Sequence, residues 1–142
     1  MKDLIKLLSQ HRDLALATVN DQGSPKVRIF QILQLTEQDL YFATAKNKEV
    51  YLQLKENPKV EMVSWHDKIS IRVAGTAFFD VSDKIQVEIF GEGQSLEEIY
   101  QSVDNPNLVF FRVKMEWAEL YDLNSNPPHR EFFDGADAKS DL

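Results

Sequence analysis

Two stretches of the sequence decide the fold, LALATVNDQGSPKVRIF (Leu14–Phe30) and LYFATAKNKEV (Leu40–Val50). In the first stretch, apolar and small residues alternate, a polar turn follows around Gly23, and a second alternating run returns. This pattern predicts two strands joined by a tight turn, because alternation places every second side chain on one face of a sheet. The second stretch predicts another strand, which runs through a polar link into the start of a helix.

The rest of the chain predicts further strands and a few short helices. Strands are expected over 60–65, 69–79, 108–115 and 117–123. Helices are expected over 2–11, 48–56, 83–90 and 95–100. About six or seven strands, mostly joined by turns, favour a mainly β fold, a small antiparallel β-barrel with flanking short helices.

One glycine interrupts the strand expected over 69–79, in the run IRVAGTAFF. Glycine inside a strand marks either a bulge or a close approach of another backbone, and for Gly75 a bulge is the simpler interpretation. Arg72 of the same run either faces solvent or marks a contact between subunits. A surface position is the simpler interpretation there too.

The composition favours a single intracellular domain. The chain has 142 residues and no cysteine, which suits one domain with its own core and suits the reducing cytoplasm. We expect the domain over 1–123 and a polar, acidic C-terminal tail, prone to fraying, over 124–142. No window approaches the roughly 18 apolar residues that a membrane span requires, so no membrane partner is expected.

The net charge of −7 opposes binding to nucleic acid. The 23 acidic residues outnumber the 16 basic ones. A surface this negative repels a phosphate backbone unless a basic patch is concentrated on it. Lys46 and Lys48 are locally basic, but Glu49 and Glu56 follow them. This pattern suits one small phosphate group better than a polyanion.

The sequence lacks the patterns typical of a metal site or of a nucleophilic enzyme. Its histidines, His11, His66 and His129, are far apart and have no cysteine partners, so we expect no bound metal. A GxSxG turn and the glycine-rich phosphate loops are absent as well. No residue stands out as a general acid or base, and the catalytic residues stay unknown at this stage.

Four polar residues are expected near the ends of neighbouring strands. Arg28 lies in the returning strand of the first stretch, and Thr44, Lys46 and Lys48 close the strand of the second. An arginine among apolar neighbours either points to solvent or binds an anion with its planar set of donors. Free backbone N–H groups at the start of a helix also favour an anion. Each segment alone is more typical of a solvated position, whereas the two together suggest a phosphate site.

The sequence resembles the flavin-binding split-barrel proteins related to pyridoxamine 5′-phosphate oxidase. Three runs carry the resemblance, LATVNDQGSPKVRIF, LYFATAKNKEVYLQLKENPKVEMVSW and ISIRVAGTAFFD, and together they extend over nearly the whole chain. The second run is the most specific, with a strand, T-x-K-x-K, a helix closed by Asn57-Pro58 and a new strand. The resemblance implies a six-stranded antiparallel split β-barrel that binds FMN at the interface of a homodimer.

The resemblance also assigns roles around the FMN phosphate. Arg28 matches the arginine that reaches the phosphate, and Thr44 matches a hydroxyl near the ribityl-phosphate. Lys46 and Lys48 lie where members of a smaller subgroup supply further positive charge. Each of these roles follows from the resemblance alone.

Three more residues match positions along the flavin ring. Ile29 and Phe30 match residues that supply backbone and apolar contacts along the flavin. Ser70 falls where the opposite subunit offers a polar side chain to the flavin.

The sequence departs from the namesake oxidase at several positions. The oxidase has a lysine where this chain has Leu33, and an Arg-Lys pair where this chain has Glu49 and Val50. Its Arg- and Pro-rich C-terminal segment, which helps to hold the pyridoxal substrate, has no counterpart in NSNPPHREFFDGADAKSDL. We therefore expect a cofactor site without true pyridoxamine 5′-phosphate oxidase activity.

These observations lead to a hypothesis with two alternatives. The first expectation is a homodimeric, FMN-dependent oxidoreductase that acts on an unknown small molecule. One alternative is a non-catalytic module that binds or senses flavin or another small ligand. The other keeps the enzyme but changes the cofactor to heme or a deazaflavin, which relatives of this barrel use.

Overall fold

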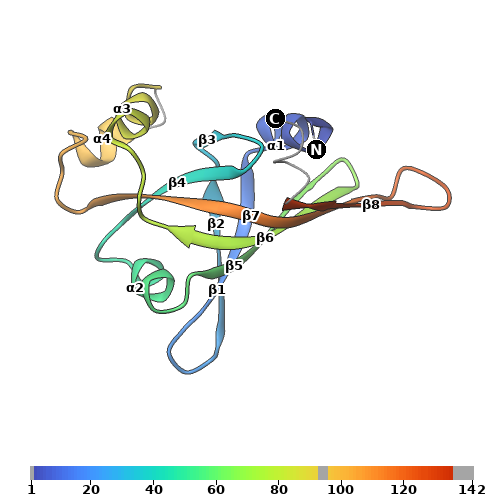
Figure 1. The fold of residues 1–142 in the computed structure, drawn as a ribbon, viewed down its shortest axis with the longest axis horizontal. Coiled ribbons are helices and arrows are strands. Elements are labelled where there is room, and N and C mark those ends of the chain that lie inside the picture. Colours follow the sequence, from blue (N-terminus) through green and yellow to red (C-terminus); the bar gives the residue numbers. More distant parts are fainter. Residues whose placement is uncertain (1, 93–95, 136–142) are drawn as a thin grey trace.

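A computed structural model describes residues 2–92 and 96–135, and its main feature is one curled antiparallel sheet (Figure 1). The strands are β1 (Asp13–Val19), β2 (Pro25–Gln31), β3 (Gln34–Leu35), β4 (Asp39–Ala45), β5 (Lys59–His66), β6 (Ile69–Phe78), β7 (Leu108–Asp122) and β8 (His129–Asp134). They follow the order β2–β1–β5–β6–β7–β4–β3, and β8 pairs with β7. The predicted mainly β fold, an antiparallel split β-barrel with short flanking helices, is confirmed, although the sheet has eight described strands where six were expected.

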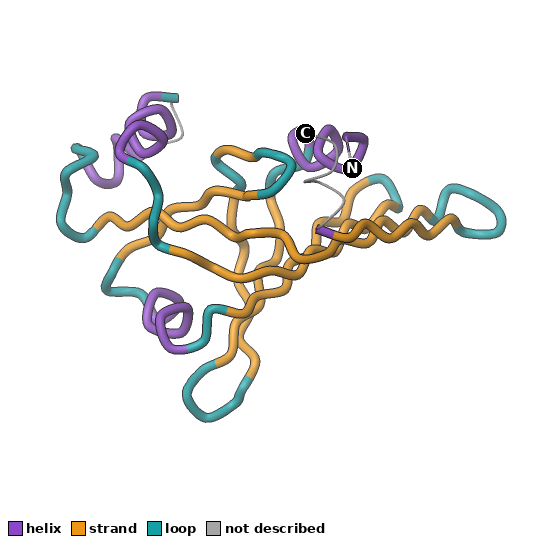
Figure 2. The backbone as a smooth tube through the Cα atoms, in the orientation of Figure 1, coloured by secondary structure: helices purple, strands orange, loops and turns teal. Residues whose placement is uncertain are grey.

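Short helices flank this sheet. They are α1 (Lys2–Gln10), α2 (Glu49–Glu56), α3 (Asp83–Gly91) and α4 (Leu96–Tyr100). Figure 2 shows α2, α3 and α4 at one end of the sheet and α1 toward the other end. The end that carries α2 and α4 is also the end at which the candidate site lies.

The main core fills the concave side of the sheet. Every second residue of β1 and β5 is buried there, including Leu16 and Met62, because alternation sends these side chains to one face. Phe42 of β4 and Phe111 of β7 are fully buried and stack with ring centroids 5.3 Å apart. Phe30 of β2 meets both rings edge to face, which ties the strand that carries Arg28 to the core.

Several predicted strand limits differ from the structure. The returning strand β2 ends at Gln31, and the next residue, Ile32, donates its N–H to the carbonyl of Arg12. The strands predicted over 108–115 and 117–123 form the single long strand β7. Residues 129–134 of the expected tail form β8, for which the sequence predicted no strand. The predicted division at residue 123 remains a prediction. Of the helix predicted over 95–100, residue 95 lies outside the described residues.

Gly75 combines both features expected of a glycine in a strand. The register between β6 and β7 shifts between Ala74 and Gly75, so the predicted bulge is confirmed. A Cβ atom at Gly75 would overlap the carbonyl oxygen of Lys114, so the backbones also approach closely. Arg72 of the same strand is exposed and pairs with Glu61, with Nε 3.1 Å from Oε1.

Beside this bulge, Glu116 of β7 accepts hydrogen bonds from two neighbouring strands. Lys59 Nζ of β5 lies 3.0 Å from Glu116 Oε1, and Thr76 Oγ1 of β6 donates to the same oxygen. Hydrogen bonds to the charged form favour it. The bond from Thr76, followed by the bond from Lys59, therefore lowers the pKa of Glu116 from its ordinary value.

Glu116→Gln is expected to reduce the pH dependence of stability. Because the pKa of Glu116 is lower in the folded than in the unfolded chain, its carboxylate stabilises the fold near neutral pH. That contribution is lost as the pH falls below 4.5, the ordinary value, through the folded pKa. The Tm of the wild type should exceed that of the variant near pH 7, and the difference should shrink toward about pH 3. A difference that stays constant over this range would contradict the assignment.

Candidate functional site

A cavity of about 690 Å³ lies at the end of the sheet that carries α2 and α4. Its wall is formed by β2, the end of β4, the start of α2, and α4. Lys26, Arg28 and Lys48 give it three cationic side chains, and Glu49 is its acidic residue. The volume lies within the range of about 300–1,000 Å³ that is typical of small-molecule sites.

Arg28 is held in this wall by two buried polar residues. Its Nη1 donates to Thr18 Oγ1 at 2.7 Å, and its Nη2 donates to Gln53 Oε1 at 2.8 Å. The Thr18 hydroxyl in turn donates to Gln53 Oε1 at 2.5 Å. Thr18 is 1 % exposed and Gln53 6 % exposed. An unpaired polar group at such depth costs about 1–3 kcal/mol, so this network stabilises the site only while it is complete.

The guanidinium of Arg28 keeps donors for a ligand. Arginine carries five N–H donors, and only Nη1 and Nη2 make hydrogen bonds to other described residues. Burial lowers the pKa of Arg28 from its ordinary value, and the charge of Glu49 acts in the opposite direction. An arginine stays protonated at physiological pH despite such a shift, so the site retains its positive charge.

Thr44 contributes a hydroxyl that lacks a partner. It lies next to the last residue of β4, it is 3 % exposed, and it lines the same cavity as Arg28. Its Oγ1 is buried and makes no hydrogen bond within the described part of the chain. Buried hydroxyls are nearly always hydrogen-bonded, so this atom fits a polar group of a ligand in the cavity.

The two predicted lysines lie in different surroundings. Lys48 is the N-cap residue of α2 and lines the cavity. Lys46 is exposed, and the cavity wall does not include its side chain. Its backbone N–H donates to the carbonyl of Asn107 at 2.8 Å. Sequence reasoning missed Lys26, although alternation along β2 places it on the same face as Arg28.

The structure brings two of the three residues predicted along the flavin to the cavity and leaves the third outside it. Phe30 lines the cavity and packs against the core. Ile29, its neighbour on β2, also contributes to the wall and is 69 % exposed. Ser70 lies elsewhere, on β6, where it is paired in register with Trp65 of β5. Ser70 is not among the described residues that line this cavity.

The side of the cavity formed by α4 could not be read from the sequence. Leu96, Ile99 and Tyr100 line it from a segment far from β2 along the chain. Burial raises the pKa of Tyr100, so its hydroxyl stays protonated at physiological pH. Cationic groups thus lie on one side of the cavity, and an apolar and aromatic surface lies on another. This arrangement suits a ligand with a phosphate and a flat apolar part.

The residues that differ from those of the namesake oxidase lie in different parts of the structure. Glu49 lines the cavity, so an acid stands where the oxidase has the first base of its pair. Val50 is buried in the main core, and Leu33 belongs to a second buried cluster with Tyr41 and Ile89. Lys26 and Lys48 are the lysines that flank Arg28 in the cavity.

The curled antiparallel sheet with short flanking helices defines the class of split-barrel proteins. Within this class, the chain belongs to the pyridoxamine 5′-phosphate oxidase family, whose sequence model matches residues 1–122. A search among curated proteins found no match. Within the described residues, no helix has the length and apolar character needed to cross a membrane.

Solved structures share this fold. A protein related to general stress protein 26, from Clostridium acetobutylicum, superposes with a TM-score of 0.78 at 18% identity, covering 96% of this chain and 97% of that one. A pyridoxamine 5′-phosphate oxidase-related, FMN-binding protein from Nostoc punctiforme gives 0.70 at 16% identity, covering 94% and 89%. A heme-binding protein from Mycobacterium smegmatis gives 0.76 at 11% identity, covering 97% and 59%. At these identities the similarity shows the fold alone.

Proposed function

We propose that this protein is a homodimeric FMN-binding flavoprotein, an oxidoreductase of a small molecule whose identity is still open. One observation carries the proposal: Arg28 and Lys48 line the same cavity as Thr44, whose hydroxyl has no hydrogen-bond partner among the described residues. Guanidinium and ammonium groups form short, charge-assisted hydrogen bonds with phosphate oxygens. Membership of a family with an FMN-binding relative of the same fold supports the choice of ligand.

Each wall of the cavity has a part in this proposal. Arg28 and Lys48 hold the phosphate, the hydroxyl of Thr44 donates to a phosphate or ribityl oxygen, and the start of α2 adds free N–H groups. Phe30 and the residues of α4 offer apolar surface to the flat ring. The bound flavin supplies the redox chemistry, while the protein binds it, orients it and limits the access of water.

The direct test is a titration of the purified protein with FMN. Binding should quench the fluorescence of FMN with a stoichiometry of one FMN per chain. Oxidoreductase activity would then appear as bleaching of the flavin absorbance by NADH or NADPH and its return in air. A protein that neither retains nor binds FMN would overturn the proposal. A protein that binds FMN but exchanges no electrons with these donors would instead support the non-catalytic alternative.

An exposed apolar face supports the homodimer. Ile29 of β2, Ala15 of β1 and Val63 of β5 lie in one row across the sheet, and Val27 is 68 % exposed beside them. Trp65 of β5 continues this face and is 60 % exposed. Contiguous exposed apolar surface of this kind typically marks a site of protein association.

Ser70 lies on the same face of the sheet, where a partner subunit would meet it. Ser70 is the register partner of Trp65, so the two side chains share one face of the sheet. A second copy that covers this face would meet both residues. Ser70 would then contribute to the partner's flavin site rather than to the cavity of its own chain.

Ile29→Glu is expected to convert the dimer to a monomer. A carboxylate in the middle of an apolar interface loses its water without gaining a partner, which costs several kcal/mol. The mass should be measured by light scattering, with Val87→Glu on α3 as the control. Val87 is 59 % exposed, but it lies outside this face, so its variant should stay dimeric. A dimer that persists in Ile29→Glu would exclude this face as the interface.

Lys48→Ala is expected to weaken FMN binding more than Lys46→Ala. Only Lys48 lines the cavity with Arg28, whereas both lysines are exposed and precede α2. Loss of one charge-assisted hydrogen bond should raise the Kd about tenfold, and loss of a distant surface charge should change it less than about threefold. Fluorescence titrations of the two variants at equal salt concentration provide the comparison. Equal effects would remove Lys48 from the phosphate site.

Heme is the second candidate, because a protein of the same fold is named as heme-binding. Heme iron commonly takes a histidine ligand. None of the three histidines lines the cavity with Arg28, which favours FMN over heme at this site. A deazaflavin would occupy the same walls as FMN. The cofactor retained on purification, identified by its absorption spectrum and mass, separates the three.

We also propose that the substrate is not pyridoxamine 5′-phosphate. Leu33 is buried in place of a lysine, and Glu49 and Val50 replace a basic pair. An acid in the cavity wall opposes a second phosphate. Purified protein loaded with FMN should produce no pyridoxal 5′-phosphate from this compound.

A further inference from the structure

We infer that Gln53 and Thr18 are positioning residues that hold the guanidinium of Arg28 toward the ligand cavity. The inference rests on the proposed function for the identity of the ligand, the phosphate of FMN. It goes beyond that function because neither residue carries a charge. Gln53 also lies outside the wall of the cavity, and so does Thr18.

Both residues interrupt an apolar pattern. Gln53 lies on the buried face of α2 with Val50 and Leu54, at the spacing where a core helix carries apolar residues. Thr18 follows Leu14 and Leu16 on the buried face of β1. A polar side chain in such a position destabilises the fold unless its hydrogen bonds are made. Their common partner, Arg28, explains why these residues are polar.

The three side chains form a closed set of hydrogen bonds. Gln53 Oε1 accepts from both Arg28 Nη2 and the hydroxyl of Thr18, so the carbonyl oxygen of the amide must face them. The hydroxyl of Thr18 accepts from Arg28 Nη1 at the same time. These two acceptors make the short hydrogen bonds to the guanidinium, at 2.7 and 2.8 Å, whereas the carbonyls of Leu16 and Lys26 lie 3.4 and 3.5 Å from Nη1. Thr18 and Gln53 therefore restrict the orientation of the guanidinium most.

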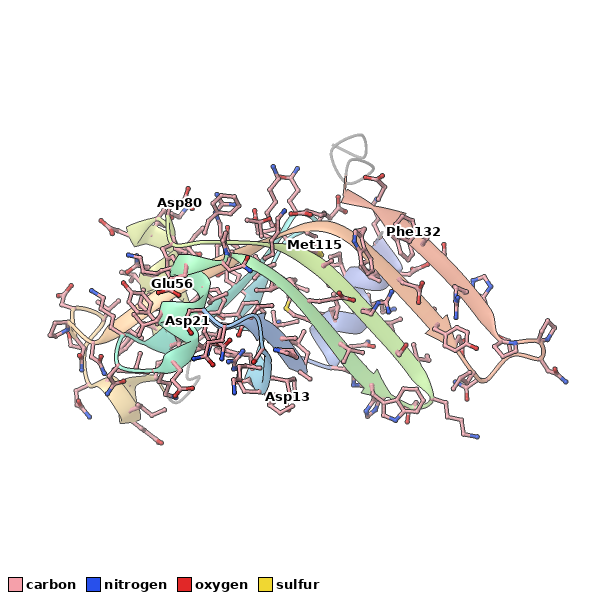
Figure 3. All side chains as sticks on the ribbon, turned by 90° about the horizontal axis from the view of Figure 1, so that it is seen from below. Asp13, Asp21, Glu56, Asp80, Met115 and Phe132 are labelled. Atoms are coloured by element: carbon pink, nitrogen blue, oxygen red, sulfur yellow. The ribbon has the colours of Figure 1, made fainter. Side chains whose placement is uncertain are left out.

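This orientation matters because carboxylates lie beyond Gln53. A second cavity, of about 280 Å³, has Gln53 in its wall together with three carboxylates, those of Asp21, Glu49 and Glu56, and the ammonium of Lys26. Glu49 and Lys26 also line the first cavity. Figure 3 shows Asp21, in the turn between β1 and β2, and Glu56, at the end of α2, on the same side of the molecule. Arg28 lines the first cavity but not the second.

A guanidinium without the two neutral acceptors would be drawn toward these carboxylates. Opposite charges attract more strongly in partly buried surroundings than in water. An arginine paired with a carboxylate offers a phosphate fewer donors and less net charge. The neutral acceptors therefore orient Arg28 without neutralising it, which a carboxylate in the same place could not do.

Gln53→Met tests the inference, because methionine keeps the length of the side chain and removes the acceptor. The Kd for FMN should rise about tenfold or more, as expected for the loss of a hydrogen bond to a charged group. Thr18→Val, which removes the other acceptor at nearly constant shape, should also raise the Kd for FMN. Gln86→Met on α3 is the matched control, because Gln86 is partly buried and bonds to a carbonyl far from Arg28. Unchanged FMN affinity in both Gln53→Met and Thr18→Val would overturn the inference.

Gln53→Glu distinguishes positioning from a structural role through pH. In this variant, the ionised carboxylate at position 53 would neutralise Arg28, whereas the protonated carboxyl would leave the charge of Arg28 free for phosphate. The ratio of the Kd of the variant to that of the wild type should therefore grow as the pH rises through the pKa of the new carboxyl. Because Arg28 lowers the pKa of a carboxyl beside it, the carboxyl at position 53 is ionised at pH 7, and a Gln53→Glu variant that binds FMN like the wild type at pH 7 would assign Gln53 a structural role only.

A third readout needs no FMN. Nitrogen-15 NMR should show slow exchange of the Nη protons of Arg28 in the wild type, and Arg28→Lys distinguishes this signal from that of Arg112, which is paired with Asp39 and Asp80. The signal should disappear in Gln53→Met and in Thr18→Val but persist in Gln86→Met. Failure of the wild type to bind FMN would overturn the proposed function while this signal still supports the positioning. Absence of the signal from a wild type that binds FMN would overturn the positioning alone.

Discussion

Arg28→Ala is expected to weaken FMN binding by about a hundredfold or more while the fold stays intact. A guanidinium can make two charge-assisted hydrogen bonds to one phosphate, each contributing about 1.5–3 kcal/mol, and about 3 kcal/mol corresponds to a hundredfold change in Kd. The fold should lose less than about 2 kcal/mol, because Thr18 and Gln53 keep the hydrogen bond between them.

The two effects are separated by measuring both in one preparation. Fluorescence titration gives the Kd for FMN, and denaturant unfolding without FMN gives the free energy of unfolding. Arg130→Ala is the control, because Arg130 is exposed on β8 and packs over Tyr121, away from the cavity. An affinity for FMN that survives in Arg28→Ala would remove Arg28 from the phosphate site.

Gly75→Ala is expected to destabilise the fold strongly, although it adds only one methyl group. The added Cβ would overlap the carbonyl oxygen of Lys114 and would lie 2.8 Å from Cγ1 of Val113. Neither neighbour can move freely, because both belong to β7, which is hydrogen-bonded to strands on either side. We expect a loss of about 3 kcal/mol and a fall of about 10 °C in Tm.

Gly91→Ala provides the matched control for this prediction. Gly91 ends α3, and an added Cβ there would meet no atom of the described residues within 4 Å, its chain neighbours and its own helix aside. Alanine has the higher helix propensity, so this variant should be unchanged or more stable by up to about 1 kcal/mol. Thermal unfolding of both variants gives the comparison. A Gly75→Ala protein with the wild-type Tm would contradict the close approach of β6 and β7.

Much of the fold could be predicted from the local alternation of apolar and polar residues. The parts that could not be predicted depend on contacts between segments that are far apart in the sequence. The pairing of β1 with β2 was predictable because two alternating runs flank a turn at Gly23, which has a φ of +78°. β8 was not predictable, because HREFFD is mostly exposed and is a strand only through its pairing with β7. The bulge opposite Gly75 lets β7 continue where the sequence predicted two strands.

The candidate site was predictable in part for the same reason. Thr44 and Lys48 follow from a strand end that leads into a helix, whereas Arg28, expected near a strand end, lies in the middle of β2. The structure brings all three to one cavity. Lys46 obeys the same local rule, yet its side chain lies outside that cavity. The contribution of α4 to the cavity wall could not be predicted, because it depends on how α4 packs across the end of the sheet. The role of Gln53 requires the distance from α2 to Arg28, which no local pattern contains.

The most direct measurement is a crystal structure of the protein with FMN. The account predicts phosphate oxygens about 2.7–2.9 Å from the guanidinium of Arg28 and from Nζ of Lys48. It also predicts that Arg28 keeps its hydrogen bonds to Thr18 and Gln53, and that Thr44 Oγ1 gains a partner on the ligand. A phosphate bound elsewhere, with Arg28 and Thr44 unchanged, would contradict the account.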